Sequence, residues 1–241
     1  MQPELHRYRP SRYSFLRLFE GAKMGLIISV VNQKGGVGKS TLTQALGAAL
    51  ASQHQKKVLV IDTDTQRTSV KWYARRCEAD PDSAPAVISV DVAGAIASNA
   101  KLQAASHDYV FIDGGAGVSA TTAAAIRAAE VVIIPVQAAW KDFESTADTV
   151  ALVKQRQALT GGPPAAYFVI TQSDKKEKIT RDITEALLEY GFPVLDAQLS
   201  ERSTHRLADL ASRTALEYRP RSKAAEDIRA ILNELIQEKV I

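Results

Sequence analysis

The sequence predicts an α/β fold, a doubly wound and mostly parallel sheet flanked by helices, from three observations. Short apolar runs alternate with longer helix-like segments from Met24 to the end of the chain. Such continuous apolar runs are typical of parallel strands, which are buried on both faces. A glycine-rich loop joins the first run to the first helix, and two later runs end in aspartate. Both features place candidate ligand-binding groups at the carboxyl ends of strands, where open α/β sheets bind ligands.

The alternation of apolar runs and helix-like segments places each element in order. The expected strands cover residues 26–32, 57–62, 86–91, 108–113, 131–136, 165–171 and 193–196. The expected helices cover residues 40–53, 66–78, 92–105, 118–129, 142–159, 178–190, 203–211 and 222–238. With 241 residues, one domain of this class has room for a substantial core. We therefore expect residues 24–241 to form a single domain.

The first strand leads into a phosphate-binding loop. This loop reads Lys34-Gly35-Gly36-Val37-Gly38-Lys39-Ser40-Thr41 and precedes a helix rich in Ala and Leu. Loop amides and the positive end of a helix dipole both attract an anion, and glycines let the backbone approach it. The pattern predicts that Lys39 reaches the β- and γ-phosphates and that the Ser40 hydroxyl ligates Mg²⁺. The fold is thus expected to be that of a P-loop NTPase.

This loop departs from the ordinary P-loop pattern at two positions. Gln33 stands where that pattern has glycine, and an additional lysine, Lys34, lies at the start of the loop. A second cation beside a triphosphate indicates extra charge neutralisation, for which the nucleotide of a neighbouring subunit is a candidate.

Two of the apolar runs end in carboxylates. Asp62 and Asp64 follow the second strand at spacing i, i+2, which puts both side chains on one side of an extended chain. Asp113 ends the fourth strand and is followed by Gly114-Gly115-Ala116-Gly117. A single aspartate there can hold Mg²⁺ through water opposite Ser40. Asp142, farther along the chain, is expected to cap a helix.

These motifs together resemble those of the ParA/MinD family of ATPases, whose P-loop carries the same additional lysine. More narrowly, the chain looks like a small plasmid-type ParA DNA-partition ATPase. The resemblance implies that Lys34 crosses a dimer interface, that Lys39 and Asp64 are catalytic with it, and that Asp64 orients the attacking water. It further implies that Asp62 supports the Mg²⁺ hydration shell. Thr65 replaces the proline usual in the family's version of the Asp62–Gln66 motif.

The resemblance also implies binding partners. It predicts a weak Mg²⁺-dependent ATPase that forms a sandwich homodimer with ATP, binds double-stranded DNA non-specifically and is released by a centromere-binding ParB-like or ribbon-helix-helix adaptor. Gln172 or Asp174 is expected to contact adenine. Arg202, Arg206, Arg219 and Arg221 lie in a segment that provides phosphate contacts in the family. The alternative for these arginines is a solvated basic face paired with nearby acidic residues.

A MinD-like membrane-associated ATPase is the alternative function. It needs a C-terminal amphipathic helix with a basic face, whereas residues 224–241 contain four acidic residues and no aromatic residue. We expect this helix to pack on the protein body, with no membrane as partner. The single cysteine, Cys77, excludes an internal disulfide and argues against a cysteine-ligated cluster. The expected location is cytoplasmic and nucleoid-associated.

Residues 1–23 stand apart from the alternating pattern. They account for the formal net charge of +3, through Arg7, Arg9, Arg12, Arg17 and Lys23 against Glu4 and Glu20. Three interpretations remain open: a flexible basic arm, an artefact of the translation start with Met24 as the true start, or a short packed helix. Because the rest of the chain is neutral, any DNA-binding surface on it must be a local patch.

Overall fold

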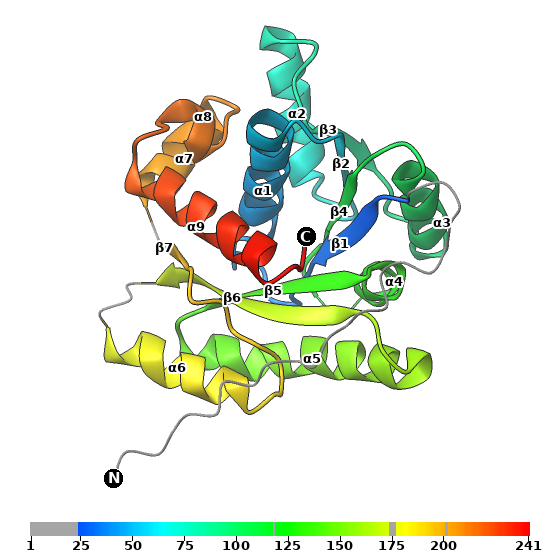
Figure 1. Cartoon of the computed structure of the whole chain (residues 1–241), viewed down its shortest axis with the longest axis vertical. Coiled ribbons are helices and arrows are strands. Elements are labelled where there is room, and N and C mark those ends of the chain that lie inside the picture. Colours follow the sequence, from blue (N-terminus) through cyan, green and yellow to red (C-terminus); the bar gives the residue numbers. More distant parts are fainter. Residues whose placement is uncertain (1–23, 118, 174–176, 201) are drawn as a thin grey trace.

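A computed structural model describes residues 24–117, 119–173, 177–200 and 202–241 of the chain. It consists of one seven-stranded sheet with helices on both faces, in the strand order β3-β2-β4-β1-β5-β6-β7 (Figure 1). Every strand pairing is parallel. The predicted fold class is confirmed. The strands are β1 Leu26–Val30, β2 Val58–Asp62, β3 Ala86–Ser89, β4 Tyr109–Asp113, β5 Val131–Gln137, β6 Ala165–Ser173 and β7 Leu199–Ser200.

The helices fall close to the predicted ranges, with one short addition. They are α1 Lys39–His54, α2 Thr68–Ala79, α3 Ala93–Ala104, α4 Ala120–Ala128, α5 Trp140–Thr160, α6 Lys178–Leu188, α7 Ser203–Leu210, α8 Ala215–Tyr218 and α9 Lys223–Gln237. The addition is α8, a single turn that begins with a capping box between Thr214 and Glu217. A helix this short does not show the apolar periodicity from which helices are predicted.

The two faces of the sheet bury separate apolar clusters. Ile28 and Val30 of β1 lie in the cluster that includes residues of α1, α2, α8 and α9. Ile27 of β1 lies in the other cluster, with residues of α3, α4, α5 and α6. Alternate residues of one strand therefore meet helices on opposite faces. This explains why the strands read as continuous apolar runs rather than as an alternation.

The prediction of a strand at residues 193–196 is wrong. Val194 forms only an isolated bridge to Phe168, and the strand beside β6 is β7. The backbone amides of Asp196 and Ala197 instead donate to the Glu234 carboxylate of α9, each at 2.7 Å. A charged acceptor on a helix has replaced the sheet ladder as the partner of these amides.

Helix α9 packs on the body of the protein, as expected from its sequence. Ile228, Ile231 and Leu235 are completely buried against the face of the sheet that α1 also covers. Asp227 of the same helix accepts the Ser200 amide at 3.3 Å, so that α9 also fixes β7. Within the described ranges, no helix is long and apolar enough to cross a bilayer. The expectations for residues 1–23 lie outside the described residues.

Candidate functional site

The glycine-rich loop lies between the end of β1 and the start of α1. Gly36 and Gly38 both have left-handed backbone angles, with φ of 78° and 87°, which glycine adopts without the steric cost of a side chain. Gly38 is also the N-cap of α1. Among the described residues, no backbone hydrogen bond occupies the amides of Gly38 and of residues 39–41. A row of unpaired amides at a helix N-terminus fits an anionic phosphate chain.

Lys39 reaches back across this loop. Its ammonium group donates to the carbonyl oxygen of Lys34 at 2.7 Å, and the residue is 7% exposed. Burial lowers the pKa of Lys39, and the neighbouring carboxylates of Asp113 and Asp64 partly offset this effect. The Lys39 ammonium group therefore lies beside the loop and near two acidic groups.

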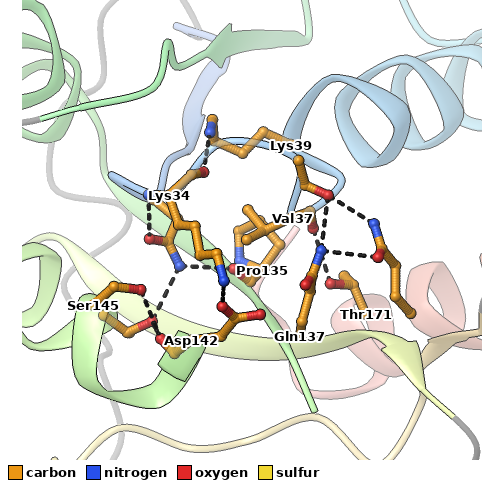
Figure 2. A network of polar contacts seen from close by, with 12 residues as sticks. Lys34, Val37, Lys39, Pro135, Gln137, Asp142, Ser145 and Thr171 are labelled. Atoms are coloured by element: carbon orange, nitrogen blue, oxygen red, sulfur yellow. Dashed lines mark hydrogen bonds and ion pairs between the residues drawn. The ribbon is translucent and has the colours of Figure 1, made fainter. Parts of the chain in front are cut away.

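Lys34 points in a different direction from Lys39. Its ammonium group forms an ion pair with Asp142 at the start of α5 (Figure 2). Asn32 orders the start of the loop, because its side chain accepts the Lys34 amide at 3.0 Å and donates to Pro135 and Thr146. The expectation that Asp142 caps a helix is wrong: the carboxylate makes no cap hydrogen bond and binds the lysine instead.

The carboxylates after β2 have different surroundings. Both oxygens of buried Asp62 accept backbone amides, from Val70 and Asp64, each at 3.0 Å. Burial raises the pKa of Asp62, although these hydrogen bonds counteract the rise. Asp62 therefore fixes both the start of α2 and the backbone of Asp64. Asp64 is half-buried, and one of its oxygens accepts the Gln66 amide at 2.9 Å.

Asp113, at the end of β4, is completely buried, as Asp62 is. Burial raises its pKa to about 7, and hydrogen bonds from Ser69 and Ser40 oppose the rise. Ser69 donates to Oδ2 at 2.7 Å, whereas the buried Oδ1 lacks a partner among the described residues. An orphaned carboxylate oxygen beside a P-loop serine fits a Mg²⁺ ion or one of its waters.

The glycine-rich segment after β4 lies between Asp64 and the P-loop. A Cβ added to Gly115 would lie 3.4 Å from the Cα of Asp64, and one added to Gly35 would lie 3.7 Å from the Cβ of Ala116. The Gly117 amide donates to the carbonyl of Gln33 at 2.6 Å. The folded chain thus brings the P-loop and the aspartates after β2 and β4 together, as the sequence predicts.

Side chains at the ends of β5 and β6 also contact the P-loop, and the sequence analysis assigned no role to two of them. Gln137 at the end of β5 donates to the Gly36 carbonyl at 3.0 Å, and Thr171 of β6 donates to the Val37 carbonyl at 2.9 Å. Gln172, expected to contact adenine, also donates to the Gly36 carbonyl, at 2.7 Å. Asp174, the other candidate for adenine, lies outside the described residues. Strand ends 100 residues or more from the loop supply these contacts, and no local motif marks them.

The predicted DNA-binding arginines have unequal surroundings. Arg202 forms an ion pair with Asp227 at 3.1 Å, and its side chain is 32% exposed. Arg206 has a partner of its own. Arg219 and Arg221 are exposed on either side of Pro220, and with Ser222 they line a shallow concavity of about 430 Å³. Arg206 is exposed as well, whereas Arg219 and Arg221 lie close together in the chain and offer two exposed cations at one place.

The segment that carries these arginines is anchored to α2. Arg76 lies over the Trp72 ring, 4.5 Å from its centroid, and donates both terminal nitrogens to the Glu217 carboxylate at 2.8 and 3.0 Å. It also donates to the carbonyl of Ser212 at 3.2 Å. Burial alone would raise the pKa of Glu217, but hydrogen bonds from Arg76 and Thr214 bring that pKa below its ordinary value. This pair holds the turn that precedes Arg219 in place.

Comparisons with known proteins agree with this geometry. The family model for the CobQ/CobB/MinD/ParA nucleotide-binding domain matches residues 28–214. The chain is 26% identical to a maintenance of carboxysome distribution protein A of Halothiobacillus neapolitanus, over 87% of the chain and 95% of the relative. It is 28% identical to the sporulation initiation inhibitor protein Soj of Bacillus subtilis, over 84% of the chain and 95% of the relative.

Solved structures share the same fold. An ATP complex of a Cyanothece McdA variant superimposes with a TM-score of 0.71 at 17% identity, covering 89% of this chain and 97% of the other. At this identity the likeness shows the fold alone. The range of the family match, residues 28–214, includes the P-loop, Asp62, Asp64 and Asp113.

Proposed function

The chain belongs to the CobQ/CobB/MinD/ParA family of nucleotide-binding domains, and from this premise we propose that it is a ParA-type positioning ATPase. In this proposal, Mg²⁺-ATP binding drives a sandwich homodimer that binds double-stranded DNA without regard to sequence. A DNA-bound ParB-like or ribbon-helix-helix adaptor stimulates hydrolysis and releases the dimer, which thereby segregates plasmid or chromosomal DNA. The observation that carries the proposal is the additional lysine, Lys34, at the start of the P-loop.

Residues of the P-loop would hold the nucleotide. The amides of residues 35–41 and the Lys39 ammonium group would bind the phosphates. Ser40 and Asp113 would hold Mg²⁺, and Asp62 would support the hydration shell of the ion. When bound, Mg²⁺ neutralises charge on the phosphate oxygens. Asp64 is half-buried, whereas Asp62 and Asp113 are completely buried, and Asp64 would orient the attacking water. Without the adaptor we expect turnover below about one per minute, far under the usual range of roughly 1–10³ s⁻¹.

Lys34 is the residue that distinguishes a dimer-forming ATPase from a generic P-loop enzyme. Its side chain is 26% exposed and lies at the edge of the loop, so it can reach a second subunit if it leaves Asp142. A lysine that crosses to the partner's phosphates would make dimerisation depend on ATP. Lys34→Ala should therefore bind ATP but neither dimerise nor hydrolyse it.

Two features favour DNA over a membrane as the surface to which the dimer binds. The large apolar residues of α9 are buried in the core except for Ile236, and one exposed side chain does not give that helix an apolar face for lipid. Arg219 and Arg221, by contrast, are exposed on a neutral body. A dimer would present this pair twice, so its affinity for DNA should depend steeply on both ATP and salt. Nucleoid association would follow from such binding.

The DNA proposal is tested by gel shifts on unrelated duplexes with ATP, with ADP and without nucleotide. We expect retention with ATP alone and no preference among duplexes. Arg219→Ala/Arg221→Ala should reduce both retention and its salt dependence while sparing ATP binding. Lys56→Ala/Lys101→Ala, which removes the same charge from other exposed positions, is the matched control. Equal binding in all nucleotide states would refute the switch.

Arg202 provides a second comparison within the same segment. Because Arg202 is paired with Asp227, the main effect of Arg202→Ala should be a loss of stability in the β7 region, and its effect on DNA binding should be minor. Co-sedimentation with anionic vesicles in the presence of ATP separates the remaining alternative, since a membrane-bound ATPase would pellet with vesicles and not with DNA.

A further inference from the structure

The carboxyl ends of β5 and β6 support the P-loop from one side through three side chains. Gln137 and Gln172 both donate to the Gly36 carbonyl, at 3.0 and 2.7 Å, and Thr171 donates to the Val37 carbonyl at 2.9 Å. Gln137 and Thr171 are direct register partners in adjacent strands. Figure 2 shows Gln137 and Thr171 on the same side of the loop, close to Val37.

Holding a carbonyl also sets the direction of the next amide. In a trans peptide unit, the C=O of one residue and the N–H of the following residue lie in one plane and point in opposite directions. Carbonyls 36 and 37 are directed toward the strand ends. The amides of Val37 and Gly38 are therefore directed away from them. The Gly38 amide is one of those that make no backbone hydrogen bond to the described residues.

Hydrogen bonds hold the side chains of both glutamines in this arrangement. Gln137 donates to the Gln172 side-chain oxygen at 2.8 Å, which leaves the Gln172 amide nitrogen as the group that meets the Gly36 carbonyl. Gln172 also has a φ of 49°, a left-handed conformation that is uncommon outside glycine. Such strain persists only where the surroundings over-determine it, and it is concentrated at functional sites.

We propose that Gln137, Thr171 and Gln172 are positioning residues that aim the P-loop amides at the phosphate chain, and that Gln172 does not read the base. This inference rests on the nucleotide-binding part of the proposed function and does not require DNA binding or dimerisation. Its consequence is chemical: the three side chains act on triphosphate binding whatever base is attached. A base reader would instead set the preference of ATP over GTP.

The experiment measures the affinities of ATP, GTP and inorganic tripolyphosphate by titration calorimetry. Gln172→Ala should weaken all three by the same factor, roughly three- to tenfold for one lost hydrogen bond, and leave the ATP-to-GTP ratio unchanged. Gln137→Ala should behave likewise. An altered ATP-to-GTP ratio in Gln172→Ala, with tripolyphosphate binding unchanged, would overturn the proposal.

Thr171 supplies a conservative pair of variants. Thr171→Val removes the hydroxyl at nearly constant shape and should weaken every phosphate ligand, whereas Thr171→Ser keeps the hydroxyl and should restore binding. A purely structural role would show no such rescue. Both glutamines carry exposed groups, so their variants provide the test even if the buried Thr171→Val does not fold.

Two further measurements separate this inference from the function it rests on. Lys39→Ala should bind none of the three ligands and marks the lower limit of the assay. Wild-type protein that binds ATP but shows no ATP-dependent dimer or DNA binding would refute the proposed switch and leave this inference standing. Wild-type affinities in the Gln137, Thr171 and Gln172 variants would refute this inference alone.

Discussion

The Lys34 ammonium group forms an ion pair with the Asp142 carboxylate, and this pair joins the P-loop to the first turn of α5. The two partners are unequally buried, since the Lys34 side chain is 26% exposed and that of Asp142 is 1% exposed. Apart from Lys34, neither Asp142 oxygen has a polar partner among the described residues. The carboxylate therefore depends on the lysine far more than the lysine depends on the carboxylate.

This asymmetry predicts unequal effects on stability. Lys34→Ala leaves a buried charge without compensation and should cost about 3–5 kcal/mol in the free energy of unfolding. Asp142→Asn leaves a lysine that can turn toward water and should cost only about 1 kcal/mol. Urea denaturation measures both. The double variant should recover most of the loss of Lys34→Ala, and a larger cost for Asp142→Asn than for Lys34→Ala would contradict this account.

The same ion pair should oppose dimerisation. If Lys34 crosses to the partner's phosphates, it must first leave Asp142, so removing that charge should favour the dimer. Asp142→Asn is expected to dimerise at lower ATP concentrations than the wild type in sedimentation experiments. Asp148→Asn, on the same helix, is the control. Unchanged dimerisation would show that the pair does not restrain Lys34.

Asp64→Ala should separate binding from hydrolysis. The Asp64 side chain lies beside Gly115 and not in the row of loop amides, so its loss should spare ATP affinity. An ATP-bound dimer should then persist in size-exclusion chromatography, with phosphate release close to zero. Asp82→Ala, at an exposed turn, is the control. Phosphate release at the wild-type rate would contradict the assigned role of Asp64.

Asp113 predicts a specific pH dependence of stability. Burial raises its pKa from 3.8 to about 7, so between about pH 4 and 7 the folded protein retains a proton that the unfolded chain has lost. The free energy of unfolding should therefore fall as pH rises through this window and level off above it. At about 1.4 kcal/mol per pKa unit, the loss amounts to a few kcal/mol.

Asp113→Asn isolates this contribution, because the amide does not titrate. Urea unfolding of the nucleotide-free protein at pH 5, 6, 7 and 8 should show a smaller decline in the variant than in the wild type. Asp82→Asn should follow the wild type. Parallel curves for Asp113→Asn and the wild type would mean that Asp113 is ionised throughout the range.

Local patterns predicted much of this molecule from its sequence. The P-loop and the aspartates after β2 and β4 follow apolar strands directly, so spacing alone places them at one edge of the sheet. Asp142, Gln137 and Ser69 were beyond such reasoning, because each acts on a group far away in the chain. The misplaced last strand has the same origin, since Glu234 of α9 takes the amides of Asp196 and Ala197.

The two edges of the sheet are its shortest strands. Four residues form β3 and two form β7, whereas the inner strands β5 and β6 have seven and nine. Short edge strands expose few unpaired backbone groups with which a strand of another molecule could form hydrogen bonds. This limits aggregation and domain swapping. Self-association must then use side-chain surfaces such as the P-loop edge. A protein that forms and dissolves dimers repeatedly is thereby shielded from irreversible strand addition.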